Sequence, residues 1–309
     1  MSNLIDNNLK NKKSELLEYY RHRAEELIIE SKQTFSDSEY KDRAIAINKG
    51  LTETRENLLK IILQEARKNK WDDKTLLESI LLTTYTNYVS MIEARNRIWE
   101  YEYMSFSRRI GELWEPFCQL CWQYPLANDI TFFVPPLFSD VKRELTNEVN
   151  QFIKSLHISQ EQKDELESYY KKVWSLVTSG EVKLELDLHF FKGNSRFVAD
   201  FKSGFSSNEK GNANRLLLVA SVYKILKEQY NCLIFVRSEE EKNNHYLQTL
   251  KSSGLWEVYC SQETYQKIYD FTGFNLSKWL AQNVNWNDDF TKKISKHIKE
   301  NNLEQYLIW

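Results

Sequence analysis

The stretch LELDLHFFKGNSRFVADFKSG, residues 184 to 204, decides the fold that we expect. Apolar and polar residues alternate on both sides of Gly193 and Asn194, a pair that favours the tight turn of a β-hairpin. With these two residues at the centre of the turn, the numbers of paired residues add up to 387. One face of the first strand is then formed by Val182, Leu184, Leu186, Leu188 and Phe190.

The opposite face of this hairpin collects charged residues. The register pairs Asp187 with Asp200 and Glu185 with Lys202. Carboxylates across an antiparallel pair have Cβ atoms about 4.5 to 5.5 Å apart and repel each other, and a hard cation such as Mg²⁺ would resolve the repulsion. Lys202 could position or help to deprotonate a water molecule and could stabilise charge on a phosphate. The pattern predicts metal-assisted phosphodiester hydrolysis.

A simpler interpretation of the same face is an exposed surface. Glu185 and Lys202 would form a cross-strand salt bridge there, beside a tolerated acid pair. His189 lies on this face one step nearer the turn, where a histidine is usually polar surface.

The composition describes a chain that can fold around a large core. It has 309 residues, of which 41% are hydrophobic and 14% aromatic, enough for one large domain or two smaller ones. Its 42 basic and 44 acidic residues give no overall positive charge. This balance argues mildly against nucleic-acid binding, although a neutral protein can hold a basic cleft. Four cysteines, a polar N-terminus and no long apolar run lead us to expect a cytoplasmic protein outside the membrane.

Helices and strands are expected to follow one another in a defined order. Residues 8–104 repeat apolar positions at intervals of three and four, which predicts a helical N-terminal region. Two more helices are expected near 138–157 and 160–178, before the hairpin. After Lys202 the patterns predict helix, strand, helix and strand, at 208–230, 231–238, 239–254 and 255–260. This order is typical of an α/β (or α+β) core with a mixed sheet.

The acidic motifs resemble the core of the PD-(D/E)XK nuclease superfamily. The letters ELD at 185–187 and DFK at 200–202 stand on two strands before a helix, with Leu186 in place of the usual proline. Upstream, RRIGELWE at 108–115 is similar to the first core helix, in which a glutamate after a glycine faces the metal. The resemblance covers roughly residues 105 to 260.

The resemblance implies a function and a role for each motif residue. Asp187 and Asp200 would bind Mg²⁺, Glu115 would be a further metal ligand, and Lys202 would assist the attacking water. A chain of this size looks most like a type II restriction endonuclease, which implies sequence-specific cleavage of double-stranded DNA, restriction-modification defence and a homodimer. The implied fold is a restriction-endonuclease-like mixed sheet flanked by helices at 105–270, between a helical region at 1–104 and C-terminal helices packed on the core at 271–309.

The polar stretch after the second strand is the candidate DNA-binding segment. Its side chains suit contacts with the DNA backbone or with bases, and a flexible surface loop explains the composition equally well. The candidate residues are Ser203, Asn208, Lys210, Asn212, Asn214 and Arg215.

Other functions remain open at this level. A repair, recombination or transposition nuclease of the same superfamily would share the core chemistry. The pair Glu185-x-Asp187 could bind the metal of a nucleotide-sugar glycosyltransferase, but such an enzyme needs a nucleotide-binding α/β domain before the acids. A helical interaction protein without catalysis is the third possibility.

Overall fold

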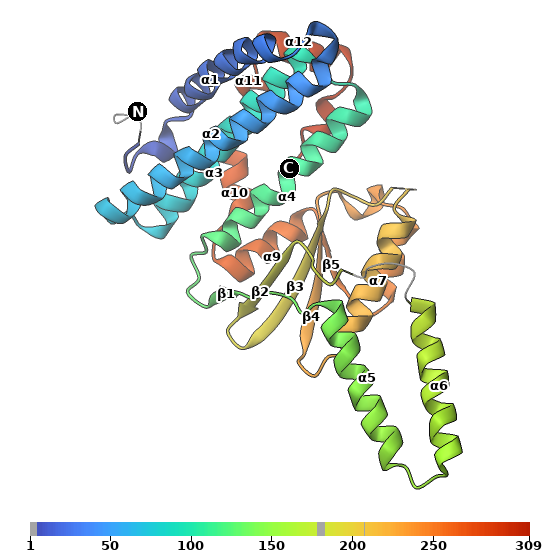
Figure 1. Ribbon diagram of the computed structural model, residues 1–309. Coiled ribbons are helices and arrows are strands. Elements are labelled where there is room, and N and C mark those ends of the chain that lie inside the picture. The colour runs from blue at the N-terminus through green and yellow to red at the C-terminus, as the bar shows by residue number, and fades with distance from the viewer. Residues whose placement is uncertain (1–4, 178–182, 207) are drawn as a thin grey trace.

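The computed structural model describes residues 5–177, 183–206 and 208–309. Figure 1 shows three parts, namely a group of long helices, a sheet with helices on its faces, and a two-helix arm that projects away from the sheet. Val182 and position 178 of the expected elements lie outside the described residues.

The helical N-terminal region is confirmed. Helices α1 (Lys13–Thr34), α2 (Tyr40–Asn69), α3 (Asp73–Ile98) and α4 (Tyr103–Gln123) are accompanied by the short 3₁₀ turns η1 (Leu9–Asn11) and η2 (Asp37–Glu39). Helix α3 packs against the other three helices and is buried along most of its length. Its first turn is capped by Asp72, whose side chain accepts the Thr75 amide at 2.8 Å. The boundary expected after residue 104 falls within the first turn of α4.

A five-stranded mixed sheet lies next to these helices, as the sequence predicted. Its strands follow chain order, β1 (Ile130–Phe132), β2 (Leu188–Lys192), β3 (Ser195–Lys202), β4 (Tyr230–Val236) and β5 (Glu257–Cys260). Strand β2 runs antiparallel to β1 and β3, while β4 and β5 run parallel to β3. The sequence did not reveal β1, because three residues are too few for a recognisable alternation.

Helices cover both faces of the sheet. Side chains of α4 and α9 (Gln262–Thr272) share one apolar core with Phe190, Phe201 and Phe235 of the strands. Helices α7 (Lys210–Ile225) and α8 (His245–Ser252) pack on the other face, against alternate residues such as Val198 and Ile234. The 3₁₀ turn η3 (Glu240–Lys242) leads into α8.

The C-terminal helices pack against the N-terminal helices. They are α10 (Leu276–Asn283), α11 (Trp286–Asp289) and α12 (Lys292–Glu300), followed by the 3₁₀ turn η4 (Glu304–Tyr306). Asp289 accepts hydrogen bonds from Tyr85 at 2.7 Å and from Lys13 at 2.9 Å. Arg21 donates twice to Glu93 at 2.9 Å, and Glu93 also accepts the Thr291 amide at 2.7 Å. The two ends of the chain are therefore joined by buried polar contacts.

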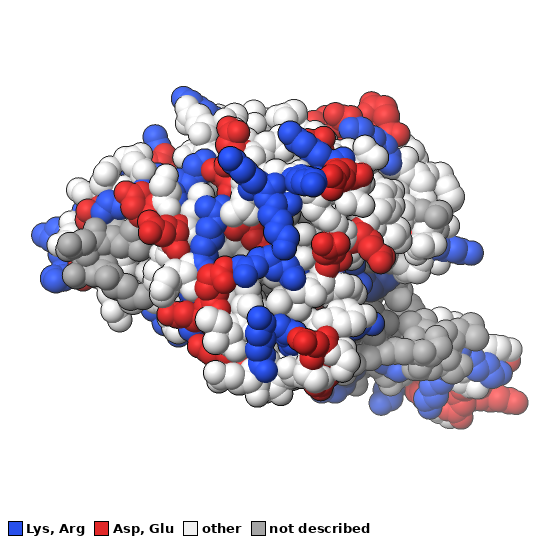
Figure 2. All heavy atoms as spheres, turned by 90° about the horizontal axis from the view of Figure 1, so that it is seen from above, with Lys and Arg blue, Asp and Glu red and all other residues white. Residues whose placement is uncertain are grey.

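The surface of the helical region is mixed in charge. Figure 2, which looks down on it from above, shows Lys and Arg side chains gathered in the middle of this face with acidic residues around them. Helix α12 lies at this end of the molecule (Figure 1) and carries four exposed lysines, Lys292, Lys293, Lys296 and Lys299. A nearly neutral chain can therefore still offer a locally basic surface.

Helices α5 (Phe138–Ser155) and α6 (Gln160–Val177) form the projecting arm (Figure 1). The arm is joined to the body at its root, where Lys227 contacts Glu144 at 3.2 Å and Glu148 at 2.6 Å. In the part of the chain that the structure describes, no helix is both long and apolar enough to span a membrane.

Candidate active site

The hairpin folds with the register that the sequence predicted. Each of the five pairs, from Leu188 with Ala199 to Lys192 with Ser195, adds up to 387. Gly193 has a φ of +58°, a backbone conformation that glycine adopts without the steric penalty of other residues. The turn therefore holds the two strands in the register that brings Asp187 near Asp200.

The two strands separate just before the acidic pair. Strand β2 begins at Leu188, so residues 200–202 of β3 extend beyond it. Asp187 lies at this point, and its Oδ2 accepts the backbone N–H of Phe201 at 2.6 Å. The Nε2 atom of His189 accepts the N–H of Leu186 at 3.2 Å. Each side chain accepts a backbone N–H at the point where the hydrogen bonding between β2 and β3 ends. These two hydrogen bonds stabilise a bend of the chain at Asp187.

This bend corrects two expectations from the sequence. Leu184 and Leu186 do not share a face with Leu188 and Phe190, because the two pairs belong to different apolar cores. His189 is not polar surface, since it is buried and burial lowers its pKa.

Asp200 is the most deeply buried acid of the site, with a side chain that is 1% exposed. Lys202 forms an ion pair with its Oδ2 atom and also donates to the Phe201 carbonyl oxygen at 3.1 Å. A guanidinium nitrogen of Arg215 lies 3.4 Å from Asp200 Oδ1. The predicted Glu185–Lys202 pair is wrong, because Lys202 pairs with Asp200 and Glu185 is exposed.

The pKa of Asp187 depends on its burial and on the charged groups around it. Burial, together with the charges of the nearby Asp200 and Glu115, raises the pKa of Asp187 to about 7, although the Phe201 amide and Lys202 act in the opposite direction. Burial also raises the pKa of Glu115, on which Lys202 and Asp200 act in opposite senses. Three groups of the hairpin and Glu115 of α4 therefore influence one another where β3 extends beyond β2.

Helix α4 approaches this edge closely at Gly111. A Cβ atom at position 111 would lie 2.0 Å from the Ser203 Oγ atom and 3.0 Å from its Cβ atom. No side chain fits there unless Ser203 moves. Glu115 lies one turn further along α4, so the absence of a side chain at Gly111 sets how near this carboxylate comes to Lys202.

The Gly111→Ala variant should lower activity at this site about tenfold or more, because small displacements of positioned groups are costly. The measurement is the initial rate of the Mg²⁺-dependent DNA cleavage that the sequence predicts. The Ser203→Gly variant and the double variant are the matched controls. Removing the Ser203 side chain makes room for the new methyl group, so the double variant should regain the rate of Ser203→Gly. A Gly111→Ala enzyme with an unchanged rate would show that close approach of α4 is unimportant.

The donor set at this edge fits Mg²⁺. In the described residues no three His, Cys, Asp or Glu side chains are arranged to hold a metal ion, so Glu115 does not complete a cluster with Asp187 and Asp200. Mg²⁺ needs only one or two carboxylates, since it retains several water molecules. The Oδ2 atom of Asp200 is close to Lys202 but receives no hydrogen bond of good geometry from any described residue. A metal ion held by this carboxylate would therefore share the Oδ2 atom with the Lys202 ammonium group.

The raised pKa of Asp187 should make both metal affinity and stability depend on pH. Without metal, the folded protein holds a proton on Asp187 that the unfolded chain loses above a pKa of 3.8. The free energy of unfolding should therefore fall as pH rises from about 4 to about 7, by at most about 1.4 kcal/mol per pH unit. Mg²⁺ affinity should rise over the upper part of this window, because the cation competes with the proton.

Urea unfolding and Mg²⁺ titration calorimetry between pH 4 and pH 8 would test this dependence. The control is Asp187→Asn, which cannot titrate and should lose this component of the pH dependence. Parallel stability curves for the two proteins would contradict the assignment.

Of the candidate DNA-binding residues, Ser203 directly follows Lys202 and Arg215 contacts Asp200. Ser203, Asn208, Lys210 and Asn214 are exposed, and the last two belong to the first turns of α7. Asn212 donates to Glu209 at 2.9 Å, and Arg215 contacts Asp200. The contact of Arg215 places it in the candidate active site, which the sequence did not reveal because fifteen residues and a loop separate the two.

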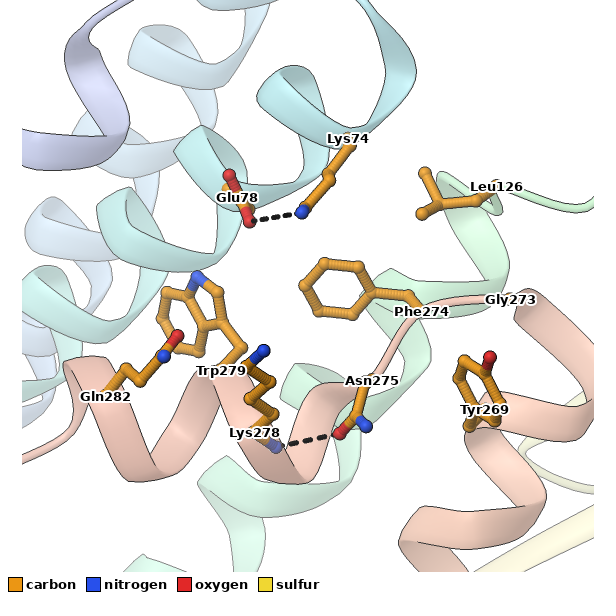
Figure 3. A pocket seen from close by; sticks show the side chains of 10 residues that line it. All are labelled: Lys74, Glu78, Leu126, Tyr269, Gly273, Phe274, Asn275, Lys278, Trp279 and Gln282. Atoms are coloured by element: carbon orange, nitrogen blue, oxygen red, sulfur yellow. Dashed lines mark hydrogen bonds and ion pairs between the residues drawn. The ribbon is translucent and has the colours of Figure 1, made fainter.

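A separate hollow of about 380 Å³ lies away from these acids. Figure 3 shows Phe274 and Trp279 on one side of it, and Lys74 with Glu78 of α3 on the other. The acids beside β3 do not line this hollow, so the candidate active site lies outside this pocket.

No protein-family model, no curated protein and no solved structure matches this chain.

Proposed function

We propose that this protein is a Mg²⁺-dependent endonuclease that hydrolyses phosphodiester bonds of double-stranded DNA. The observation that carries the proposal is the arrangement of Asp187, Asp200 and Lys202 where β3 extends beyond β2, with Glu115 of α4 near enough to affect the pKa of Asp187. Two acids that could hold a metal ion and a lysine that could orient a water molecule are suited to metal-assisted phosphodiester hydrolysis, and a further acid on a preceding helix is what the family resemblance implies.

The order of the elements around these residues supports the proposal. Helix α4 with Glu115 precedes the sheet, the β2–β3 hairpin carries the two aspartates, and α7, β4, α8 and β5 follow. This is the order that the resemblance to PD-(D/E)XK nucleases implies. The glycosyltransferase alternative requires a nucleotide-binding α/β domain before the acids, and the chain instead has long helices there.

Each residue would have a distinct task. Asp187 and Asp200 would hold Mg²⁺, which when bound polarises the phosphate and makes a water molecule more acidic. Lys202 is already beside Asp200, so its ammonium group would lie near a phosphate attracted by the bound Mg²⁺, and it would orient the attacking water. Arg215 would add positive charge where the transition state gains negative charge. The resemblance implies products with 5′-phosphate ends.

The finer assignment, a type II restriction endonuclease, extends this proposal. It implies a defined recognition sequence, restriction-modification defence and a homodimer. The exposed Ser203, Asn208, Lys210 and Asn214 would contact DNA beside the acids.

Incubation of the protein with phage DNA and Mg²⁺, followed by gel electrophoresis, tests the proposal. Discrete fragments are expected, and a parallel reaction with a chelator should leave the DNA intact. A smear would mean non-specific cleavage. The protein would then still be a nuclease, and a repair or recombination nuclease would be favoured over a restriction enzyme. Intact DNA in Mg²⁺ and in Mn²⁺, together with no heat of metal binding, would overturn the proposal and favour a helical interaction protein.

A further inference from the structure

The projecting arm exposes an unusual number of apolar side chains. Helix α5 buries only Val141 and Ile153, and Val141 packs at the root, against the core beside α7. Further out, Phe152 is 65% exposed. The two helices bury little apolar surface against each other, so their contact adds little stability. Exposed apolar side chains on the arm can therefore contact another molecule.

The exposed apolar residues of α6 form one stripe. Leu166, Tyr169 and Val173 are 40%, 54% and 58% exposed, and their spacing of three and four places them on one side of the helix. The half-buried residues of α6 between 160 and 173 are Lys163, Glu167 and Tyr170. Lys163 donates to the Lys154 carbonyl of α5 at 2.8 Å, so this other side is the one that lies next to α5. The apolar stripe therefore lies about a quarter turn around the helix from the side that faces α5, where it is exposed.

The charges along α6 are divided between its two halves. Its first half carries four acids, Glu161, Asp164, Glu165 and Glu167, and one base, Lys163, whereas its second half carries Lys171 and Lys172. Glu165 and Lys172 are seven residues apart, so they flank the apolar stripe on the same side. A helix of this kind is complementary to a copy of itself that runs in the opposite direction, because acids then face lysines at both ends.

We propose that α6 pairs antiparallel with α6 of a second copy of this chain, with Leu166, Tyr169 and Val173 at the centre. Glu165 of each copy then lies opposite Lys172 of the other, and a two-fold axis crosses the stripe near Tyr169. Each copy contributes the same surface, as a closed two-fold dimer requires. The proposal rests on the surface of the arm and not on the proposed nuclease chemistry, so either can fail without the other.

The chemistry of the arm favours a second copy over DNA or an anionic membrane. Residues 138–173 hold six basic and seven acidic side chains, so the arm has no excess of positive charge to attract phosphates. Because the stripe consists of three side chains in each copy, the contact is small and the dimer should be weak and dependent on concentration.

Sedimentation velocity of the full chain, from about 1 to about 100 µM, tests the pairing in the range expected for a small interface. The wild type should shift from monomer to dimer within this range. Leu166→Glu and Tyr169→Glu should each weaken the dimer by about tenfold or more, because each change places a charge in both halves of the contact. Ile45→Glu is the matched control, since Ile45 on α2 is 64% exposed and lies outside the arm.

A charge exchange distinguishes the antiparallel pairing from a nonspecific apolar contact. Glu165→Lys should weaken the dimer, and Lys172→Glu should do the same. The double variant restores opposite charges across the two-fold axis and should recover most of the wild-type association. A wild type that stays monomeric over the whole range, or a dimer that is indifferent to Leu166→Glu, would overturn the proposal. Failure of the double variant to recover would overturn the antiparallel arrangement.

Discussion

If the proposed function holds, the Asp200→Asn variant should cleave DNA about 10² to 10⁴ times more slowly than the wild type, because it removes the charge of a proposed metal ligand and the partner of Lys202. Asn has the same size as Asp, so the variant should still fold. It should also still bind DNA, since the exposed polar residues around the edge are unchanged. Initial cleavage rates in Mg²⁺ and band-shift assays in Ca²⁺ measure the two effects separately.

The reason for expecting so large an effect is the position of Asp200 among its neighbours. Its side chain contacts Lys202 and Arg215, and its charge contributes to the raised pKa of Asp187. The substitution therefore changes the metal ligand, the position of the lysine and the protonation of the second acid at once. As a further readout, the pKa of Asp187 should fall in the variant, because the repulsion from Asp200 is gone.

One further variant tests the same site, and another serves as the control. Lys202→Ala should also abolish cleavage and leave DNA binding measurable. Lys49→Ala removes an exposed lysine far from the acids in sequence, on α2, and should cleave like the wild type. If Asp200→Asn or Lys202→Ala cleaved at the full rate, the nuclease assignment would have to be abandoned.

The hairpin could be predicted from the sequence because its determinants are local. A two-residue turn at Gly193 and the alternation of side chains fix the register within about ten residues on either side. The helical N-terminal region and the mixed sheet were predictable for the same reason, since periodicity shows which elements form. The position of β1 was not, because it pairs with a strand more than fifty residues away.

The remaining features of the site depend on contacts between distant parts of the chain. The bend at Asp187 forms because its carboxylate accepts the Phe201 amide, and no periodicity reports a hydrogen bond of that kind. Arg215 reaches Asp200 only because α7 folds back beside β3. Glu115 was a candidate through family resemblance, and its approach to the edge depends on the packing of α4 at Gly111.

Trp122 of α4 makes the central contacts between this helix and the sheet. Trp122 is fully buried and lies among Phe190, Phe201 and Phe235 of three adjacent strands, with ring centroids 5.6 to 5.9 Å apart. It therefore joins the helix that carries Glu115 to the strand that carries Asp200. Its indole N–H has no hydrogen-bond acceptor among the described residues, so the contribution of the ring is apolar packing.

The Trp122→Ala variant should lower the free energy of unfolding by about 3 to 5 kcal/mol, because it leaves a large cavity between helix and sheet. The melting temperature should fall by roughly 10 °C, since each kcal/mol corresponds to a few degrees in a chain of this size. Trp122→Phe should cost much less, as it keeps most of the ring packing and removes a buried donor that lacks a partner. Met104→Ala on the same helix, where the side chain is 72% exposed, should be nearly neutral. Calorimetry on the four proteins measures these differences. Equal losses in the Ala and Phe variants would mean that the indole group, and not the volume of the ring, holds α4 on the sheet.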